Sequence, residues 1–171
     1  IYNLFRAAVP TGQSTEEVVQ RMASIFIPYY DAHKCDFTRP YDGIPGMLKT
    51  ITAAGVRLAV ASNKYQDGAE KLVHHFFGEY DFVRILGQRE GQPIKPDPAI
   101  VDQILAEVPS VTKSETVYVG DSNVDMQTGL NAGVRTVGVS WGFRTREELA
   151  AYSPSAIVDT PEELSRVILG A

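Results

Sequence analysis

Short apolar runs rich in β-branched residues alternate with helical patterns over most of the chain, and this alternation constrains the fold more than any other feature. The runs that we expect to form strands are 57–62, 82–87, 116–120 and 135–140. Helical patterns end at Gly55 and at Gly133 and cover 67–77, 97–108 and 161–169. Strands that alternate with helices form parallel βαβ units whose sheet is covered on both faces. The pattern therefore predicts an α/β fold, a doubly wound parallel sheet within residues 39–171.

The beginning of the chain, residues 1–38, differs because it holds helical patterns and no candidate strand. A first helix is expected to end at Pro10–Gly12. A second is expected to begin with Ser14 as its N-cap and Glu17 completing a capping box, and to run toward Ala32. The Pro- and Gly-rich stretch 36–46 then indicates a linker. We predict a small helical part joined by this linker to the α/β domain.

Composition excludes several classes of partner. The net charge is -5 and no cluster of Lys and Arg is present, which argues against nucleic acid. No apolar run reaches the roughly 20 residues that would span a bilayer, and no secretory signal is recognisable. The single cysteine, Cys35, cannot form an internal disulfide and suits a reducing compartment. We expect a cytoplasmic protein, monomeric or homodimeric, with no membrane partner.

Two carboxylates follow the expected strand 116–120, in the stretch VYVGDSNVD. Asp121 and Asp125 lie where that strand ends and a helix starts, and this edge of an open α/β sheet is where ligands bind. The simpler alternative is that Asp121 only caps the helix. Capping needs one short polar residue, whereas this loop also offers Ser122 and Asn123. We therefore favour a ligand-binding role for the pair.

Two further polar groups are expected at the same edge. Ser62 and Asn63 follow the strand 57–62, and a hydroxyl beside backbone amides can bind a phosphate oxygen. Lys95 lies in the stretch PIKPDP, where prolines restrict the backbone and can aim the ammonium group. Each signal alone is weak, because a polar turn and a solvated lysine are common. Together they predict that Ser62, Lys95 and Asp121 converge on one cleft.

In this order the motifs resemble the second, third and fourth motifs of the haloacid dehalogenase-like (HAD) superfamily. The segments RPYDGIPGMLKTITAAGVRLAVASNK, KPDP, VYVGDSNVDMQTGLNAG and VGVSWGF are most similar to its phosphoglycolate phosphatase-like branch. The resemblance implies that residues 1–38 are part of a helical cap domain and that 39–171 form the hydrolase core. It also implies a Mg²⁺-dependent phosphatase that acts on a small phosphorylated metabolite through an aspartyl-phosphate.

The resemblance assigns a role to each candidate residue. Asp121 would bind Mg²⁺ directly, with Asp125 at the metal or just behind it. Ser62 would bind the phosphoryl group with help from the Asn63 amide. Lys95 would neutralise the phosphoryl charge and steady the nucleophile.

The first motif of the superfamily, Asp-x-Asp-Gly-Thr, is absent from the sequence. The Asp-Gly pairs present, Asp42-Gly43 and Asp67-Gly68, do not end an apolar strand. We therefore expect the nucleophile to lie on an additional N-terminal segment, because the chain begins at Ile1 inside a helical pattern. The strands that precede Ser62 and Asp121 should then flank a gap of roughly 9–10 Å, which is two strand spacings. The 171 residues alone should be inactive.

Alternative functions are a phosphosugar mutase on the same fold and a non-catalytic module that truly lacks the first motif. A dehalogenase, which needs no metal, is disfavoured by the two aspartates. Other polar or aromatic residues receive no catalytic role, because surface or core positions explain them equally well: Arg6, His74, His75 and Trp141.

Overall fold

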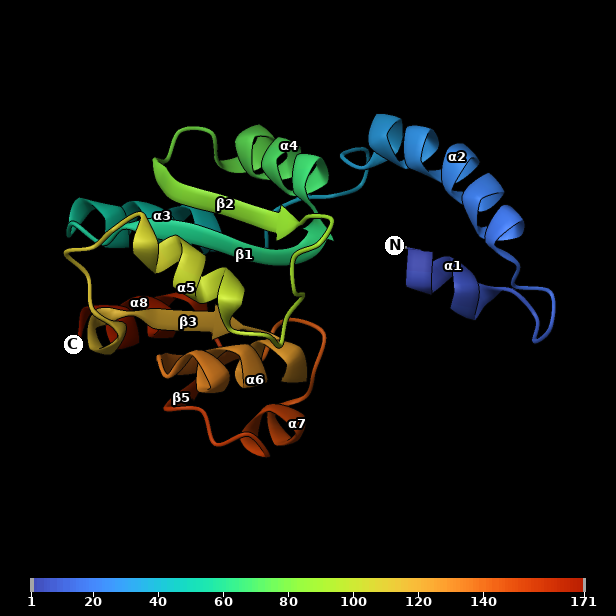
Figure 1. Cartoon of the computed structure of the whole chain (residues 1–171). Helices are drawn as coiled ribbons and strands as arrows, with labels where there is room; N and C mark the ends of the chain where they lie inside the picture. Colours follow the sequence, from blue (N-terminus) through green and yellow to red (C-terminus); the bar gives the residue numbers. More distant parts are fainter. Residues whose placement is uncertain (1, 171) are drawn as a thin grey trace. The chain divides into compact units, whose positions relative to one another are not determined.

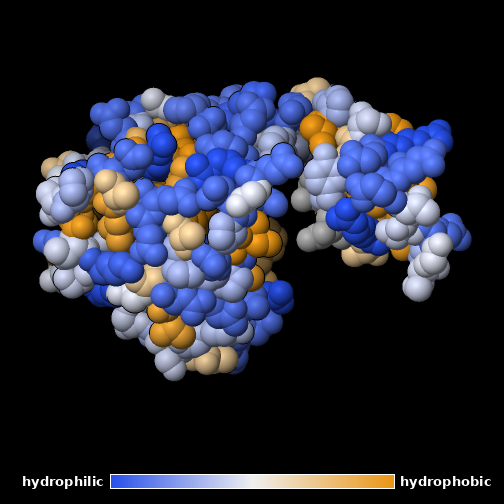
Figure 2. Space-filling view, viewed as in Figure 1, coloured by the Kyte–Doolittle hydropathy of each residue, from blue (hydrophilic) through white to orange (hydrophobic). Residues whose placement is uncertain are grey.

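A computed structural model of the protein describes residues 2–170 and divides the chain into two compact units, Ile1–Arg39 and Pro40–Ala171 (Figure 1). The first unit is helical and the second holds all the strands of the described residues. The face of each unit seen in Figure 2 is mostly hydrophilic, with apolar patches among the polar residues. None of the described helices is long and apolar enough to cross a membrane.

The helical unit consists of α1 (Tyr2–Ala8) and α2 (Glu16–His33). Its small core is made by Phe5, Val19 and Ala23, which are at most 4% exposed. The two helices are also joined by an ion pair between Arg6 and Glu16, with 2.8 Å between nitrogen and oxygen. An apolar cluster and one exposed ion pair thus hold the two helices together.

The predicted capping box of α2 is wrong by one residue. The N-cap is Thr15, not Ser14, and its hydroxyl accepts a hydrogen bond from Val18 N at 3.3 Å. Glu17 is therefore the second residue of the helix and cannot reach back as a capping-box partner. It still lies in the first turn, where a carboxylate is favoured by the helix dipole.

The α/β unit follows the predicted alternation. Its elements are α3 (Ile44–Ala53), β1 (Leu58–Tyr65), α4 (Gln66–Phe77), β2 (Phe82–Gln88), α5 (Ala99–Ala106), a 3₁₀ turn η1 (Lys113–Glu115), β3 (Val117–Gly120), α6 (Asn123–Ala132), β4 (Arg135–Val139), α7 (Arg146–Ala150), β5 (Ala156–Val158) and α8 (Pro161–Leu169). All paired strands are parallel, so the predicted α/β fold is confirmed. The last short strand β5 and the helix α7 before it were not predicted.

The strands form two separate sheets, β1–β2 and β3–β4–β5 (Figure 1). Within the described residues β1 and β3 do not pair, so the sheet has not closed between the strands that carry the candidate residues. Val119 on β3 is 37% exposed, which is high for an apolar residue in a parallel sheet. Each of the two strands therefore presents an open edge.

Two apolar clusters hold the α/β unit together. In the first, Ile100 and Val101 of α5 pack with Leu86 of β2 and with Ala132 of α6, and Tyr118 of β3 lies against the same cluster. Because α5 touches elements of both sheets, it joins them without any strand pairing. The second cluster is built by β4, β5 and α8 and consists of Val137, Val139, Val158 and Leu164.

Candidate active site

The ammonium group of Lys95 lies between the middle of β1 and the first turn of α6. Its Nζ donates to the carbonyl oxygen of Ala61 at 2.9 Å and to Oδ1 of Asp125 at 2.7 Å. The side chains of Lys95 and Asp125 are only 10% and 12% exposed. Through Lys95, a largely buried ion pair thus connects β1 to the helix that follows β3.

The surroundings of Lys95 keep it charged. Burial alone lowers the pKa of an ammonium group, but the oxygens of Tyr118 and Asp125 more than offset it, so the pKa of Lys95 lies above its ordinary value. The Lys95 Nζ also lies 5.8 Å from the centroid of the Tyr118 ring. Burial raises the pKa of Tyr118, which keeps its hydroxyl protonated near neutral pH. The result is a fixed positive charge at the edge of the site.

Asp125 is fully engaged by its neighbours. One carboxylate oxygen receives Lys95 Nζ, and the other accepts a hydrogen bond from Ser122 Oγ at 2.6 Å. Ser122 is also the N-cap of α6, since its hydroxyl accepts from Asp125 N at 3.3 Å. The cap of this helix is therefore Ser122 and not Asp121. Both carboxylate oxygens of Asp125 therefore have a hydrogen-bond partner within the protein.

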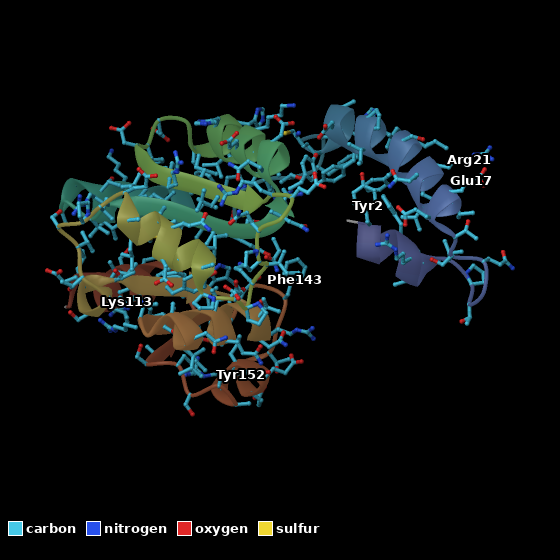
Figure 3. All side chains as sticks on the ribbon, in the orientation of Figure 1. Tyr2, Glu17, Arg21, Lys113, Phe143 and Tyr152 are labelled. Carbon is cyan, nitrogen blue, oxygen red and sulfur yellow. The ribbon has the colours of Figure 1, made fainter. Side chains whose placement is uncertain are left out.

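Asp121 is oriented by the loop that follows β4. Its Oδ2 accepts from Phe143 N at 3.1 Å, and its main-chain oxygen accepts from Arg144 N, also at 3.1 Å. A Cβ atom at Gly142 would lie 2.1 Å from Asp121 Oδ2, so the loop approaches this closely because residue 142 is glycine. Phe143 itself projects outward and is 87% exposed (Figure 3).

This loop was not predicted to be part of the site. Trp141 in the same stretch packs partly against the β4–β5–α8 cluster, which agrees with the core position considered for it. The available signal was Gly142, because a glycine just after a strand often marks a close backbone approach.

Ser62 and Asn63 lie inside β1 rather than after it. Pairing with β2 is continuous from Ala59 to Ala61, after a register shift between Leu58 and Ala59, and resumes only at Tyr65, so the intervening residues form an irregular stretch of the strand. The hydroxyl of Ser62 accepts from Lys64 N at 3.1 Å. The Asn63 side chain is turned to the backbone of Lys95. A continuous series of hydrogen bonds thus runs from Asn63, next to Ser62, through Lys95 and Asp125 to Ser122, the residue after Asp121.

Gly120 explains the spacing of the two aspartates. A Cβ atom at this position would lie 2.1 Å from the Cβ of Asp125, so only glycine lets the first turn of α6 fold back onto the end of β3. The sequence Gly-Asp-x-x-x-Asp therefore places Asp121 at the strand end and Asp125 against the strand, within reach of Lys95.

Replacing Gly120 by Ala should destabilise the protein, because the new methyl group would collide with a side-chain root that cannot rotate away. We expect the free energy of unfolding to fall by about 1–3 kcal/mol, the usual cost of overpacking. Urea denaturation measures this change. Gly46→Ala in α3 is the matched control, because a Cβ there meets nothing within 4 Å, and it should leave stability equal or slightly higher. Equal stability of both variants would contradict this account of Gly120.

The carboxylates of the candidate site provide only part of a Mg²⁺ site. Among the described residues no group of three His, Cys, Asp or Glu side chains is close enough to hold a metal on its own. Asp121 nevertheless has one carboxylate oxygen, Oδ1, outside its bond to Phe143 N. Mg²⁺ typically uses one or two carboxylates and completes its shell with phosphate oxygens and water. The residues present therefore fit half of a magnesium site, the other half being substrate and solvent.

The remaining polar residues considered from the sequence lie elsewhere. His74 and His75 are in the last turn of α4. Arg6 is engaged with Glu16 in the helical unit. Neither the last turn of α4 nor the ion pair of Arg6 with Glu16 includes Lys95 or Asp121.

Comparison with known proteins places the chain in a family. Residues 4–139 match the family model of haloacid dehalogenase-like hydrolases. A phosphoglycolate phosphatase from Psychrobacter arcticus is 29% identical over 95% of this chain and 70% of its own length. The pyrophosphatase PpaX of Halalkalibacterium halodurans is 26% identical over 89% of this chain and 70% of its own.

A solved structure agrees with these relatives. A candidate phosphoglycolate phosphatase from Lactobacillus delbrueckii subsp. bulgaricus has a TM-score of 0.82 and is 36% identical, covering 92% of this chain. The chain spans 65% of that structure's length. The protein belongs to the haloacid dehalogenase-like hydrolase family, and the resemblance seen in the motifs is confirmed. Its named relatives are phosphatases, which confirms the expected class of hydrolase at the level of the family.

Proposed function

We propose that the protein is a Mg²⁺-dependent phosphatase of small organic phosphate monoesters in the cytoplasm, with phosphoglycolate as the first substrate to test. The observation that carries this proposal is the buried ammonium group of Lys95. Its Nζ donates to the carbonyl oxygen of Ala61, which precedes Ser62 in β1, and to the carboxylate of Asp125 in α6, in a protein of this family. Phosphoryl transfer needs such fixed positive charge, because negative charge on the phosphoryl oxygens must be neutralised.

Each candidate site residue has one task in this proposal. Ser62 and the amide of Asn63 bind phosphoryl oxygens, and Lys95 neutralises their charge. Asp121 would hold Mg²⁺, which would supply further neutralisation of the phosphate charge. Asp125 keeps Lys95 in place rather than binding the metal directly, which its two existing contacts support.

We propose that the nucleophile is an aspartate on a strand that inserts between β1 and β3 and is not among these 171 residues. The open edges of β1 and β3 support this, because unpaired backbone on neighbouring strands is unfavourable. The carboxylate would bond to phosphorus as the ester oxygen leaves and takes up a proton. Water would then hydrolyse the aspartyl-phosphate and release phosphate.

The helical unit would act as part of a cap domain that contributes to substrate choice. Its separation as a compact unit before the Pro- and Gly-rich stretch supports this role. The alternatives are a phosphosugar mutase and a non-catalytic module. An Asp-x-Asp-Gly-Thr motif in the full protein would distinguish an enzyme from the non-catalytic module.

The test is phosphate release from a panel of phosphate esters by the protein that carries the nucleophile strand. We expect turnover of one or more small monoesters with Mg²⁺ and none when the metal is chelated. Turnover that is insensitive to chelation would refute the metal-dependent mechanism. Transfer of phosphate between positions of a sugar, without release, would indicate the mutase.

A further inference from the structure

Two asparagine side chains bond to the backbone of the loop around Lys95. The segment between β2 and α5 closes two turns of its own, Gln92 N to Arg89 O at 3.2 Å and Asp97 N to Ile94 O at 3.0 Å, and its first residues also bond to Gln103 of α5. None of these contacts joins the segment to β1 or α6. Bonds from β1 and α6 therefore add to the restriction by the prolines in setting where the Lys95 side chain points.

Asn63 makes the first attachment at two points. Its Nδ2 donates to the main-chain oxygen of Lys95 at 3.1 Å, and its Oδ1 accepts from Lys95 N at 2.9 Å. Because the amide is planar, two bonds to the same residue fix both the position and the orientation of that backbone unit. Asn63 thus acts on Lys95 through its side chain, in addition to any contact of its own amide with phosphate.

Asn131 makes the second attachment from α6. Its Nδ2 donates to the main-chain oxygen of Pro96 at 2.9 Å. The same helix carries Asp125, whose carboxylate receives the Lys95 ammonium group at 2.7 Å. Helix α6 therefore holds this loop at two places, once at the backbone and once at the tip of the lysine side chain.

We propose that Asn131 is a positioning residue, which together with Asn63 sets where the Lys95 ammonium group stands relative to the phosphoryl group. This inference rests on the proposed phosphatase function. A displacement of about 1 Å at a catalytic group can cost on the order of 10²-fold in rate. Since Lys95 opposes charge that is largest in the transition state, its displacement should lower kcat more than it changes KM.

The informative variant is Asn131→Asp, which keeps the shape of the side chain but replaces the donor that Pro96 O requires with an oxygen. Asn131 is exposed, so this variant should fold. Asn63→Ala is the second variant, because it removes both bonds to Lys95. Leu130→Ala is the control on the same helix, at a residue that is 65% exposed and apolar.

The first measurement is hydrogen exchange of the Lys95 amide, followed by NMR in the 171-residue chain. We expect exchange to accelerate by at least about tenfold in Asn63→Ala and measurably in Asn131→Asp, because opening costs less when attachments are lost. The control should exchange like the wild type. Unchanged exchange in both asparagine variants would overturn the positioning role.

The second measurement is steady-state kinetics of the same substitutions in the protein that carries the nucleophile strand. We expect kcat of Asn131→Asp to fall roughly tenfold or more with KM changed by less than about threefold. Faster exchange with unchanged kcat would overturn the inference that this attachment matters for catalysis. If the wild type hydrolyses no phosphate ester, the proposed function fails, and hydrogen exchange still decides whether the two asparagines fix Lys95.

Discussion

Asp121→Asn, introduced into the protein that carries the nucleophile strand, will lower Mg²⁺-dependent turnover by at least ~10²-fold, because losses of this size follow even from changes around metal ligands. The carboxylate of Asp121 accepts a hydrogen bond from Phe143 N through Oδ2, which leaves Oδ1 outside this bond. An amide at this position keeps the shape but removes the negative charge that a hard divalent cation prefers. The measurement is the initial rate as a function of Mg²⁺ concentration.

The matched control is Asp67→Asn in the same unit. Asp67 forms an exposed i,i+4 ion pair with Lys71 at 2.7 Å, a type of contact that contributes little to stability. It should leave both the rate and its Mg²⁺ dependence unchanged. An Asp121→Asn enzyme with wild-type rates at low Mg²⁺ would contradict the ligand role of Asp121.

The order of the core elements could be predicted because each strand carries its own local signal. The run Phe82–Gln88 combines apolar and β-branched residues between polar turns, and the run that ends at Gly120 does the same. Gly133 ends α6 in the left-handed conformation that was expected, with φ 68°. Parallel pairing then followed from the alternation with helices.

The missed elements are short or depend on neighbours. Strand β5 is three residues long and is recognisable only by its pairing with Val137–Val139. Helix α7 did have a signal, the capping box Thr145–Glu148, which was overlooked because only five helical residues follow it. At α2 two adjacent hydroxyl residues, Ser14 and Thr15, are candidates for the cap, and the local sequence does not choose between them.

Candidate site residues could be proposed from the sequence, whereas their contacts could not. Ser62, Lys95 and Asp121 were proposed because each lies in a recognisable local motif near a strand or helix end. The bonds from Asn63 and Asn131 to the Lys95 loop join residues 32 and 35 positions apart. No local pattern reports contacts at that distance, and the same holds for the approach of Gly142 to Asp121.

The largest effect is expected from the nucleophile strand itself. Purified protein consisting of the 171 residues should release no phosphate above background, although its Lys95, Asp125 and Asp121 groups are in place. Catalytic groups act as a unit, and the loss of a nucleophile alone can cost on the order of 10⁶ in turnover. In the proposed mechanism the remaining residues would bind and neutralise phosphate but could not form the covalent intermediate.

The most direct measurement compares initial rates of phosphate release by two proteins under identical Mg²⁺ conditions. One is the 171-residue chain, and the other is the same chain joined to the segment proposed to carry the nucleophile strand. A third sample, with the nucleophile aspartate of that segment changed to asparagine, controls for the added stability of a completed sheet. The account predicts turnover only in the extended protein with the intact aspartate. Substantial Mg²⁺-dependent turnover by the 171 residues alone would contradict it, because the nucleophile would then have to lie within them.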